Sequence, residues 1–456
     1  IENDTYHVFE FSTTENLYLN YNLKDFLYDL DFELLLDENP EVNFISDNPG
    51  LENEQGFKVL SPGSYLGFLY PYTINDAETF STSYSLELDT KSWFENVSIP
   101  NDPYFDKQWH FLNTGQAGGL DNYDIFAPEA WKRINQTPNV TVAVIDSGID
   151  RLHPDLIDNM WVNENEIPNN GIDDDKNGYI DDLYGWDFYN DDNEPMPFVD
   201  QYDIFPSSLD NDHGTHVAGI IGATGNNNIG VSGVSWNVNL MNLKVFGDST
   251  GGAYDSDILR AIRYATNNGA KIINLSLGAS ESIIKDENGV VTDIFPMTFA
   301  EFQQQNPYIY QAYYDVLKYA SDNGVFIVAA IGNDGDLENR YPNVGNTSKF
   351  TSTPADFSSV IPGMMSVVAI NNRGDKSSYS QYGELASIAA PGGEQAVINQ
   401  GGILSTVTRN SSNSIDSNNG NGYGYLQGTS MAAPVVAGAA ALLLGKDPNL
   451  TPVEIK

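Results

Sequence analysis

The chain has 456 residues, a formal net charge of −42 from 63 acidic and 21 basic residues, and no cysteine. The length predicts one large domain with a further module. The negative charge argues against nucleic acid and anionic membranes as partners, and the lack of cysteine excludes disulfides, thiol nucleophiles and thiolate metal sites.

The first part of the chain differs from the rest. Residues 1–98 are rich in Tyr, Phe, Leu and acidic side chains, and alternating segments such as residues 6–11 and 57–60 predict a small strand-containing domain. No catalytic motif occurs there. Residues 99–106 contain two prolines and several turn formers, so they are predicted to be a linker. The large domain then covers residues 107–456.

Beyond the linker, short apolar runs alternate with helical patterns. One predicted helix covers residues 255–268 and ends before Gly269, and a second lies within residues 297–323 and ends before Gly324. The alternation predicts an α/β fold, a doubly wound parallel sheet with helices on both faces, whose ligands bind at the carboxyl ends of the strands. The predicted strands are residues 140–145, 240–245, 271–277, 325–330 and 366–370.

The remaining segments predict two surface loops, a buried helix and incomplete chain termini. Residues 162–206 form an acidic insert, and residues 410–421 form a polar surface loop of low complexity. The most apolar stretch, residues 435–444, is too short to span a membrane and predicts a buried helix. The chain opens on Ile1 and stops at Lys456 within a predicted helix start, so we expect an absent leader and a truncated C-terminus.

Three motifs carry the residues of a nucleophilic site. The first strand of the large domain runs into Asp146, residues 213–219 (HGTHVAG) begin a helix with His213, and residues 428–434 (GTSMAAP) open a helix with Ser430 and Pro434 in its first turn. A serine hydroxyl becomes a strong nucleophile when an imidazole takes its proton, and a carboxylate orients and stabilises that imidazole.

These motifs, in the order Asp, His, Ser, resemble the signature motifs of subtilisin-like serine proteases, the subtilase family, over residues 107–456. Taken singly, they would indicate a turn, a structural histidine and a helix cap. Together they predict a serine endopeptidase that forms an acyl-enzyme intermediate, with Asp146, His213 and Ser430 as its triad. The resemblance implies a structural role for His216, three residues after the base.

A fourth motif supplies an oxyanion donor. Residues 329–335 (AAIGNDG) follow a predicted strand and resemble the family segment whose asparagine side chain donates to the oxyanion. The resemblance assigns this role to Asn333. The second donor would be the backbone N–H of Ser430, at the start of its helix.

The resemblance also places substrate-binding residues. Residues 275–278 resemble the strand that pairs with the substrate backbone, and residues 330–332 and 352–355 would form other pocket walls. Ala279 replaces the usual next glycine, which would narrow a neighbouring subsite. No acidic residue is clearly placed at the base, so we expect an apolar or broad preference. The predicted substrate-binding residues are Leu275, Ser276, Leu277, Gly278, Ala330 and Gly332.

Two segments suggest Ca²⁺ as a cofactor. Residues 225–231 (GNNNIGV) resemble the calcium loop of the family, and oxygen ligands of this kind suit Ca²⁺. The ligands implied by the resemblance are Gln108, Asp155, Gly225, Asn227, Ile229 and Val231.

The second segment lies in the acidic insert. Asp173, Asp175 and Asn177, followed by Gly178, reproduce the start of an EF-hand calcium loop. Tyr184 stands where the closing Glu is expected, so the match is incomplete. Such a site would be completed by Tyr179 at the seventh position and by Asp181 or Asp182. The alternative is a solvated acidic loop.

The resemblance implies that residues 1–98 are a propeptide, an intramolecular inhibitor cleaved between about Asn96 and Asn101; an unrelated accessory domain is the alternative. The expected protein is secreted, extracellular and monomeric, and acts on proteins or peptides. Two other function classes fit the sequence less well. A catalytically inactive, calcium-stabilised binding protein would not need every triad and oxyanion position filled. A metal-dependent hydrolase would need zinc-type histidine spacing, which the five histidines do not show.

Overall fold

The computed structural model divides into two compact units, Ile1–Ser98 and Ile99–Lys456. In the first unit it describes the backbone of the strands and residues 97–98. In the second it describes residues 99–134, 139–197, 209–247, 252–280, 283–285, 291–339, 346–347, 349–395, 399–409, 411–415 and 421–456. Parts of the predicted loops at 162–206 and 410–421 therefore lie outside the described residues.

The N-terminal unit is built from antiparallel strands, as its alternating pattern predicts. One sheet has the order β1-β6-β3-β4 and the other has the order β5-β2-β7. The strands are β1 (His7–Thr13), β2 (Leu17–Lys24), β3 (Leu30–Leu36), β4 (Asn39–Ser46), β5 (Gln55–Leu60), β6 (Gly63–Pro71) and β7 (Ser85–Asp89).

The larger unit has a central seven-stranded sheet of order β18-β17-β15-β11-β8-β10-β9, in which every neighbouring pair is parallel. Each predicted strand is present, and the acidic insert adds the edge strand β9. The strands are β8 (Val140–Asp146), β9 (Gly185–Asp187), β10 (Val238–Lys244), β11 (Ile272–Leu275), β15 (Phe326–Ala330), β17 (Met364–Ile370) and β18 (Ile388–Pro391).

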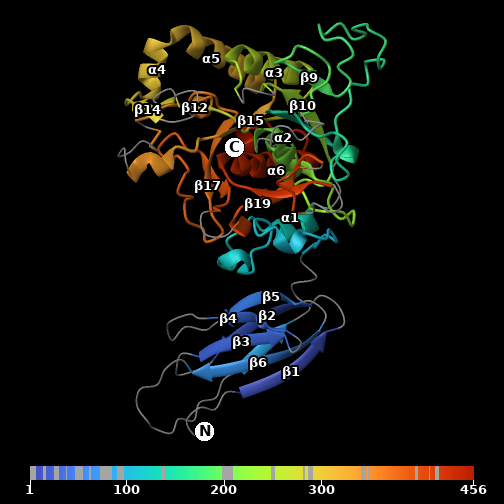
Figure 1. Ribbon diagram of the computed structural model, residues 1–456, viewed down its shortest axis with the longest axis vertical. Coiled ribbons are helices and arrows are strands. Elements are labelled where there is room, and N and C mark those ends of the chain that lie inside the picture. The colour runs from blue at the N-terminus through green and yellow to red at the C-terminus, as the bar shows by residue number, and fades with distance from the viewer. Residues whose placement is uncertain are drawn as a thin grey trace. The chain divides into compact units, whose positions relative to one another are not determined.

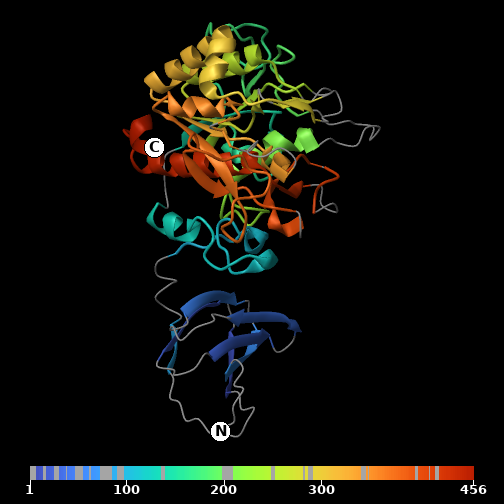
Figure 2. The same cartoon turned by 90° about the vertical axis from the view of Figure 1, so that its left-hand side faces the viewer.

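Helices cover both faces of this sheet (Figures 1 and 2). Helices α3 and α5 pack on one face, and α2 and α6 pack together on the other. The predicted fold class, a parallel α/β sheet with helices on both faces, is therefore confirmed. The helices are α1 (Ala127–Arg133), α2 (Leu209–Gly222), α3 (Asp255–Asn267), α4 (Phe299–Gln305), α5 (Pro307–Asp322), α6 (Thr429–Lys446) and α7 (Pro452–Ile455).

Three two-stranded ribbons complete the larger unit. They pair β12 with β16, β13 with β14, and β19 with β20, all antiparallel. Their bounds are β12 (Ala279–Ser280), β13 (Ile283–Lys285), β14 (Val291–Ile294), β16 (Ser352–Thr353), β19 (Ile403–Thr406) and β20 (Tyr423–Leu426).

The single helix expected within residues 297–323 is two helices. Thr298 and Glu301 form a capping box that begins α4, and α5 starts anew at Pro307. Proline has no N–H to continue a helix, but it is well suited to the first position of a new one. Gly324, whose φ is 82°, follows the end of α5 as predicted.

Helix α6 runs through the centre of the larger unit (Figure 1). Among the described residues it is the one helix long and apolar enough to cross a membrane, and 78% of it is buried inside the protein. It also packs against strands β8, β11, β15 and β17. These contacts are those of a core helix, and they confirm the buried helix predicted at residues 435–444.

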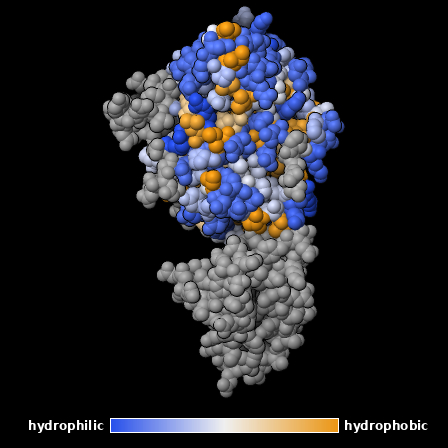
Figure 3. Space-filling view, turned by 90° about the vertical axis from the view of Figure 1, so that its right-hand side faces the viewer, coloured by the Kyte–Doolittle hydropathy of each residue, from blue (hydrophilic) through white to orange (hydrophobic). Residues whose placement is uncertain are grey.

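One face of the larger unit is shown in Figure 3. Hydrophilic residues cover most of it, and hydrophobic residues are scattered among them in small groups. This distribution is usual for a folded surface, because scattered apolar side chains need no partner.

Candidate active site

The carboxyl ends of two adjacent strands form the centre of the candidate site. Strands β8 and β11 are neighbours, and the chain continues outward to β10 on one side and to β15 on the other. At such a switch point the loops after the two strands diverge and leave a crevice for a ligand. Asp146 is the last residue of β8, and Ser276 directly follows β11.

Asp146 and His213 are hydrogen-bonded. His213 Nδ1 lies 2.7 Å from Asp146 Oδ1, and the carboxyl group is fully buried while about a quarter of the imidazole is exposed. The same Oδ1 accepts the N–H of Ser147. Because Nδ1 donates to the carboxylate, Nε2 of the neutral ring is left as a proton acceptor. A side chain on Gly214 would collide with the carbonyl oxygen of Gly148, so glycine is needed where α2 meets this strand end.

Ser430 is the second residue of α6, and the N-cap of this helix is Gly428, whose φ is 151°. Its Oγ donates to the carbonyl oxygen of Ser276 at 3.2 Å, and its own carbonyl oxygen accepts from Ser276 Oγ at 2.7 Å. Pro434 explains the second bond. It lies inside the helix rather than in the first turn as expected, and its missing N–H frees the Ser430 carbonyl four residues earlier.

Asn333 and the start of α6 present two donors to one space. Asn333 Oδ1 accepts from the N–H and the hydroxyl of Thr429, at 2.9 and 3.0 Å. Because these two bonds hold the oxygen against Thr429, the amide nitrogen of Asn333 points away from Thr429. If Gly428 had a Cβ atom, this atom would lie 3.6 Å from both Asn333 Nδ2 and Ser430 N. Both nitrogens therefore border the small space beside Gly428. Two N–H groups around one small space can stabilise a negative oxygen.

These groups line one cavity of about 270 Å³. Leu275 is not in its lining, because it ends β11 and packs in the core. Asp334 is in the lining, so the pocket contains an acidic residue that the sequence did not place there. The predicted residues brought together are Asp146, His213, Ser276, Leu277, Gly278, Ala330, Gly332, Asn333 and Ser430. Further lining residues, to which the sequence assigned no role in the site, are Ser147, Phe246, Ser280, Asp334, Gln381 and Thr429.

His216 is not among the residues that line the cavity. Its Nε2 lies 3.0 Å from the carbonyl oxygen of Ile403 and 3.1 Å from that of Gly424, which belong to β19 and β20. Burial lowers its pKa to about 3, with a smaller contribution from nearby His213. A neutral imidazole that ties α2 to a ribbon has the contacts of a structural residue.

Two buried carboxylates meet at the loop of residues 225–231. Asp155 accepts from Asn227 Nδ2 and from the N–H of Val231, at 2.8 and 2.9 Å. Asp102 accepts the N–H groups of Asn226 and Asn227. Burial raises the pKa of Asp155 to about 7 and also raises that of Asp102. A positive ion at this loop would offset the cost of burying two negative groups.

The other predicted residues of this loop lie as follows. Asn227 Oδ1 accepts the N–H of Ile229, and Gly225 packs against the indole of Trp236. The amide of Gln108 is committed elsewhere: it accepts the N–H of Ser232 and donates to the carbonyl oxygens of Ser232 and Leu404. Asp102, rather than Gln108, is the side chain from the linker region that contacts residues 226–227. In the sequence, Asp102 is marked only as an acidic residue between two prolines.

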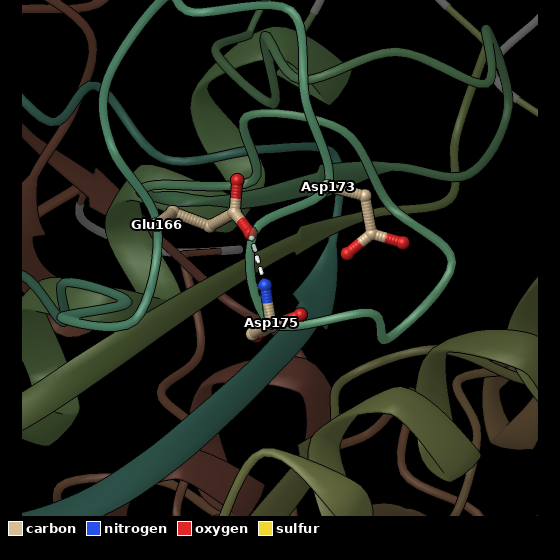
Figure 4. Close-up of side chains that lie close together, drawn as sticks. All are labelled: Glu166, Asp173 and Asp175. Carbon is tan, nitrogen blue, oxygen red and sulfur yellow. Dashed lines mark hydrogen bonds between the residues drawn. The ribbon is translucent and has the colours of Figure 1, made fainter.

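In the acidic insert, three carboxylates come together. Figure 4 shows Glu166, Asp173 and Asp175, each of which offers one oxygen within 4.8 Å of the others. Glu166 is nearly buried and accepts the N–H groups of Asp174 and Asp175. It precedes the EF-hand-like motif by seven residues, so the motif could not include it.

The remaining residues of the insert have other contacts. Asn177 donates its N–H to both Asp173 and Asp175. The ring of Tyr179 packs against Trp186. Asp181 accepts the N–H groups of residues 170 and 171, and Asp182 accepts from Asn163, Asn177 and Tyr264. The three-carboxylate group therefore contains Glu166 in place of Asp181 and Asp182.

A family model described as the subtilase family matches residues 137–456. The chain belongs to the subtilase family. It is 31% identical to a thermophilic serine proteinase of Bacillus sp. (strain AK1), over 78% of this chain and 62% of that protein. It is 30% identical to the halolysin-like extracellular serine protease Nep of Natrialba magadii, over 80% of this chain and 48% of that protein.

Among solved structures, a protease of Pseudoalteromonas arctica is similar to this subtilase, with 30% identity and a TM-score of 0.51. The match covers 78% of this chain and 90% of that structure. The chain spans 62% of the length of the thermophilic serine proteinase and 48% of the length of the protease Nep.

Proposed function

We propose that this subtilase is a serine endopeptidase that cleaves proteins or peptides. One observation carries the proposal: Asp146, His213, Asn333 and Ser430, which are far apart in the sequence, line a single cavity at the carboxyl ends of the central strands. The hydrogen bond from His213 to Asp146 supports the roles of base and orienting carboxylate.

In the proposed reaction, His213 Nε2 takes the proton of Ser430 Oγ as this oxygen attacks the carbonyl carbon of the scissile bond. Asn333 Nδ2 and the Ser430 N–H then donate to the resulting oxyanion. His213 passes the proton to the leaving amine, which departs and leaves an acyl-enzyme on Ser430. Water, activated by the same imidazole, releases the acyl group and restores the hydroxyl.

A fluorophosphonate probe tests the nucleophile. We expect stoichiometric labelling of Ser430, located by peptide mass spectrometry, and none in Ser430→Ala. Ser359, an exposed serine outside the cavity, provides the control, since Ser359→Ala should label as the parent does. An unlabelled but folded parent would contradict the proposal and favour the inactive, calcium-stabilised binding protein.

We further propose Ca²⁺ at two places. At the first, Asp102, Asp155 and Asn227 would supply side-chain oxygens, with carbonyl oxygens of Gly225, Ile229 and Val231. At the second, Glu166, Asp173 and Asp175 would hold the ion, with Asn177 and Tyr179 beside them. The grouping of carboxylate oxygens within 4.8 Å supports the second site.

The N-terminal unit is proposed to be a propeptide of a secreted zymogen. The strand-built unit Ile1–Ser98 and the relative named as extracellular support this proposal. Sequencing the N-terminus of active enzyme from a culture supernatant tests it. We expect a first residue between positions 96 and 102, whereas active enzyme that retains Ile1 would contradict the propeptide role.

A further inference from the structure

Asp212 is a buried carboxylate that directly precedes the proposed base, His213. It lies in α2, it is fully buried, and it is not among the residues that line the cavity containing Ser430. Burying a carboxylate is costly unless hydrogen-bond donors surround it. The proposed reaction does not use this group, so its donors indicate what it does.

Within the described residues, four hydrogen bonds hold the carboxylate of Asp212, and all come from one short segment. Its Oδ1 accepts the N–H and the hydroxyl of Thr408, at 3.1 and 2.5 Å. Its Oδ2 accepts from Ser411 Oγ at 2.6 Å and from Asn413 Nδ2 at 2.7 Å. Hydrogen bonds to an ionised acceptor are stronger than those between neutral groups. The start of α2 is therefore held by residues that lie 196 to 201 positions further along the chain.

The same segment holds the loop that follows Asp146. Arg409 donates its backbone N–H and its Nε–H to Asp150 Oδ2, at 3.0 and 2.8 Å. Asp150 is buried and lies in the loop directly after β8. The segment thus binds next to both members of the proposed acid–base pair. We call it the clasp, and its members are Thr408, Arg409, Ser411 and Asn413.

The clasp matters because the acid–base pair comes from two separate elements. Asp146 ends β8 and His213 lies in α2, and a 2.7 Å hydrogen bond joins their side chains. To act as the base, His213 Nε2 must also come within hydrogen-bonding distance of Ser430 Oγ. A misplacement of about 1 Å can lower the rate of such a step about 100-fold. A segment that holds both elements can therefore control the rate without contacting the substrate.

We infer that Asp212 is a positioning residue for the base and that, through the clasp, it holds His213 where it can accept the proton of Ser430. The inference rests on the proposed endopeptidase function and adds a residue to it. Neither Asp212 nor any clasp residue lines the cavity, so their loss should lower kcat and leave KM unchanged.

Steady-state kinetics on one fluorogenic peptide test this role. Fluorophosphonate labelling of Ser430, carried to completion, counts the active sites, so that kcat refers only to folded enzyme. In Asp212→Ala we expect kcat per active site to fall about 10- to 100-fold, with KM unchanged within about 2-fold. Asp212→Asn keeps an acceptor for Thr408 and should recover part of this loss.

A double-mutant cycle tests whether Asp212 acts through the clasp. Thr408→Val removes one donor and keeps the shape of the side chain. Because both changes release the same contact, Asp212→Ala combined with Thr408→Val should lose no more kcat than Asp212→Ala alone. Losses that multiply in the double variant would overturn the inference. Asp315→Ala, an exposed carboxylate on α5, should leave kcat and KM unchanged.

Other outcomes separate positioning from stability and from the proposed function. A residue that only stabilises the fold changes the number of active sites but not their turnover. Parent-like kcat per active site in Asp212→Ala therefore overturns the inference, even if less urea unfolds the variant, and so does a loss confined to KM. Absence of both cleavage and labelling in the parent would instead overturn the endopeptidase function.

A second variant serves if Asp212→Ala does not fold. Ser411→Ala combined with Asn413→Ala removes both donors to Oδ2 and leaves the carboxylate and Thr408 in place. We expect kcat per active site to fall about 10-fold there, with KM unchanged. Parent-like turnover in this variant would overturn the inference.

Discussion

In the proposed reaction, the two ends of the Asn333 carboxamide have separate roles. Its oxygen is held by two bonds from Thr429, which directs its nitrogen to the space shared with Ser430 N. We expect Asn333→Ala to lower kcat by about 10²- to 10³-fold with little change in KM, because the donor acts on the oxyanion of the transition state. Steady-state kinetics on one peptide measure both constants.

Thr429→Val provides the matched comparison, since it keeps the donor and removes only the hydroxyl bond that orients it. A smaller loss in kcat is expected there. A loss of less than 10-fold in Asn333→Ala, or a loss confined to KM, would show that Asn333 binds substrate without stabilising the oxyanion.

Asp356 makes the stability of the fold depend on pH. Its carboxyl group is buried, accepts from Ser352 N and Thr351 Oγ1, and has one oxygen without a partner. Burial raises its pKa from 3.8 to about 7. Between these values the unfolded chain has lost the proton and the folded protein keeps it, so stability falls as pH rises and the loss is complete above about pH 7.

Asp356→Asn should remove this slope, because the amide keeps the acceptor and cannot ionise. The difference between the two pKa values corresponds to roughly 4 kcal/mol at pH 8, an upper limit for the gain. Urea unfolding at pH 4.5, 6 and 8, in a Ser430→Ala background that prevents self-digestion, measures it. Parallel pH profiles for the two proteins would contradict the prediction, and the exposed Asp315→Asn serves as control.

At the scale of elements, five strands of the central sheet were predictable because each is a short, mostly buried apolar run. The two edge strands were not predicted: β9 has only three residues, and half of β18 is exposed. The run at residues 140–145 became β8 almost residue for residue. The ends of helices were less predictable. The division between α4 and α5 depends on Pro307, and the place of Pro434 inside α6 depends on a hydroxyl from Ser276, 154 residues away in the chain.

The same distinction applies to the candidate site. Asp146, His213, Asn333 and Ser430 each lie in a short contiguous motif, so the sequence alone could single them out. Asp102, Glu166 and Gln381 could not be found in this way. Asp102 reaches a loop 124 residues further along the chain, and Gln381 lines the cavity where its N–H donates to the carbonyl oxygen of Gly332. Such contacts are created by the fold and leave no local pattern.

At the scale of the whole molecule, a net charge of −42 means that the folded chain repels itself, so that bound cations stabilise it. The two proposed calcium sites gather carboxylates from separate segments: Asp102 with Asp155, and Glu166 with Asp173 and Asp175. An ion that binds only the folded state stabilises it by about 4 kcal/mol when its free concentration is 1,000 times the dissociation constant.

We therefore expect a chelator to lower the thermal unfolding temperature of the Ser430→Ala protein, and added Ca²⁺ to restore it. Asp155→Asn and Asp173→Asn should each remove part of this calcium response, and the double variant should remove most of it. Asp315→Asn, an exposed carboxylate outside both groups, should respond as the parent does. Calorimetric scans with and without chelator measure the response. An unchanged unfolding temperature in chelator would contradict both sites, and a response unaffected by Asp173→Asn would leave the insert as a solvated acidic loop.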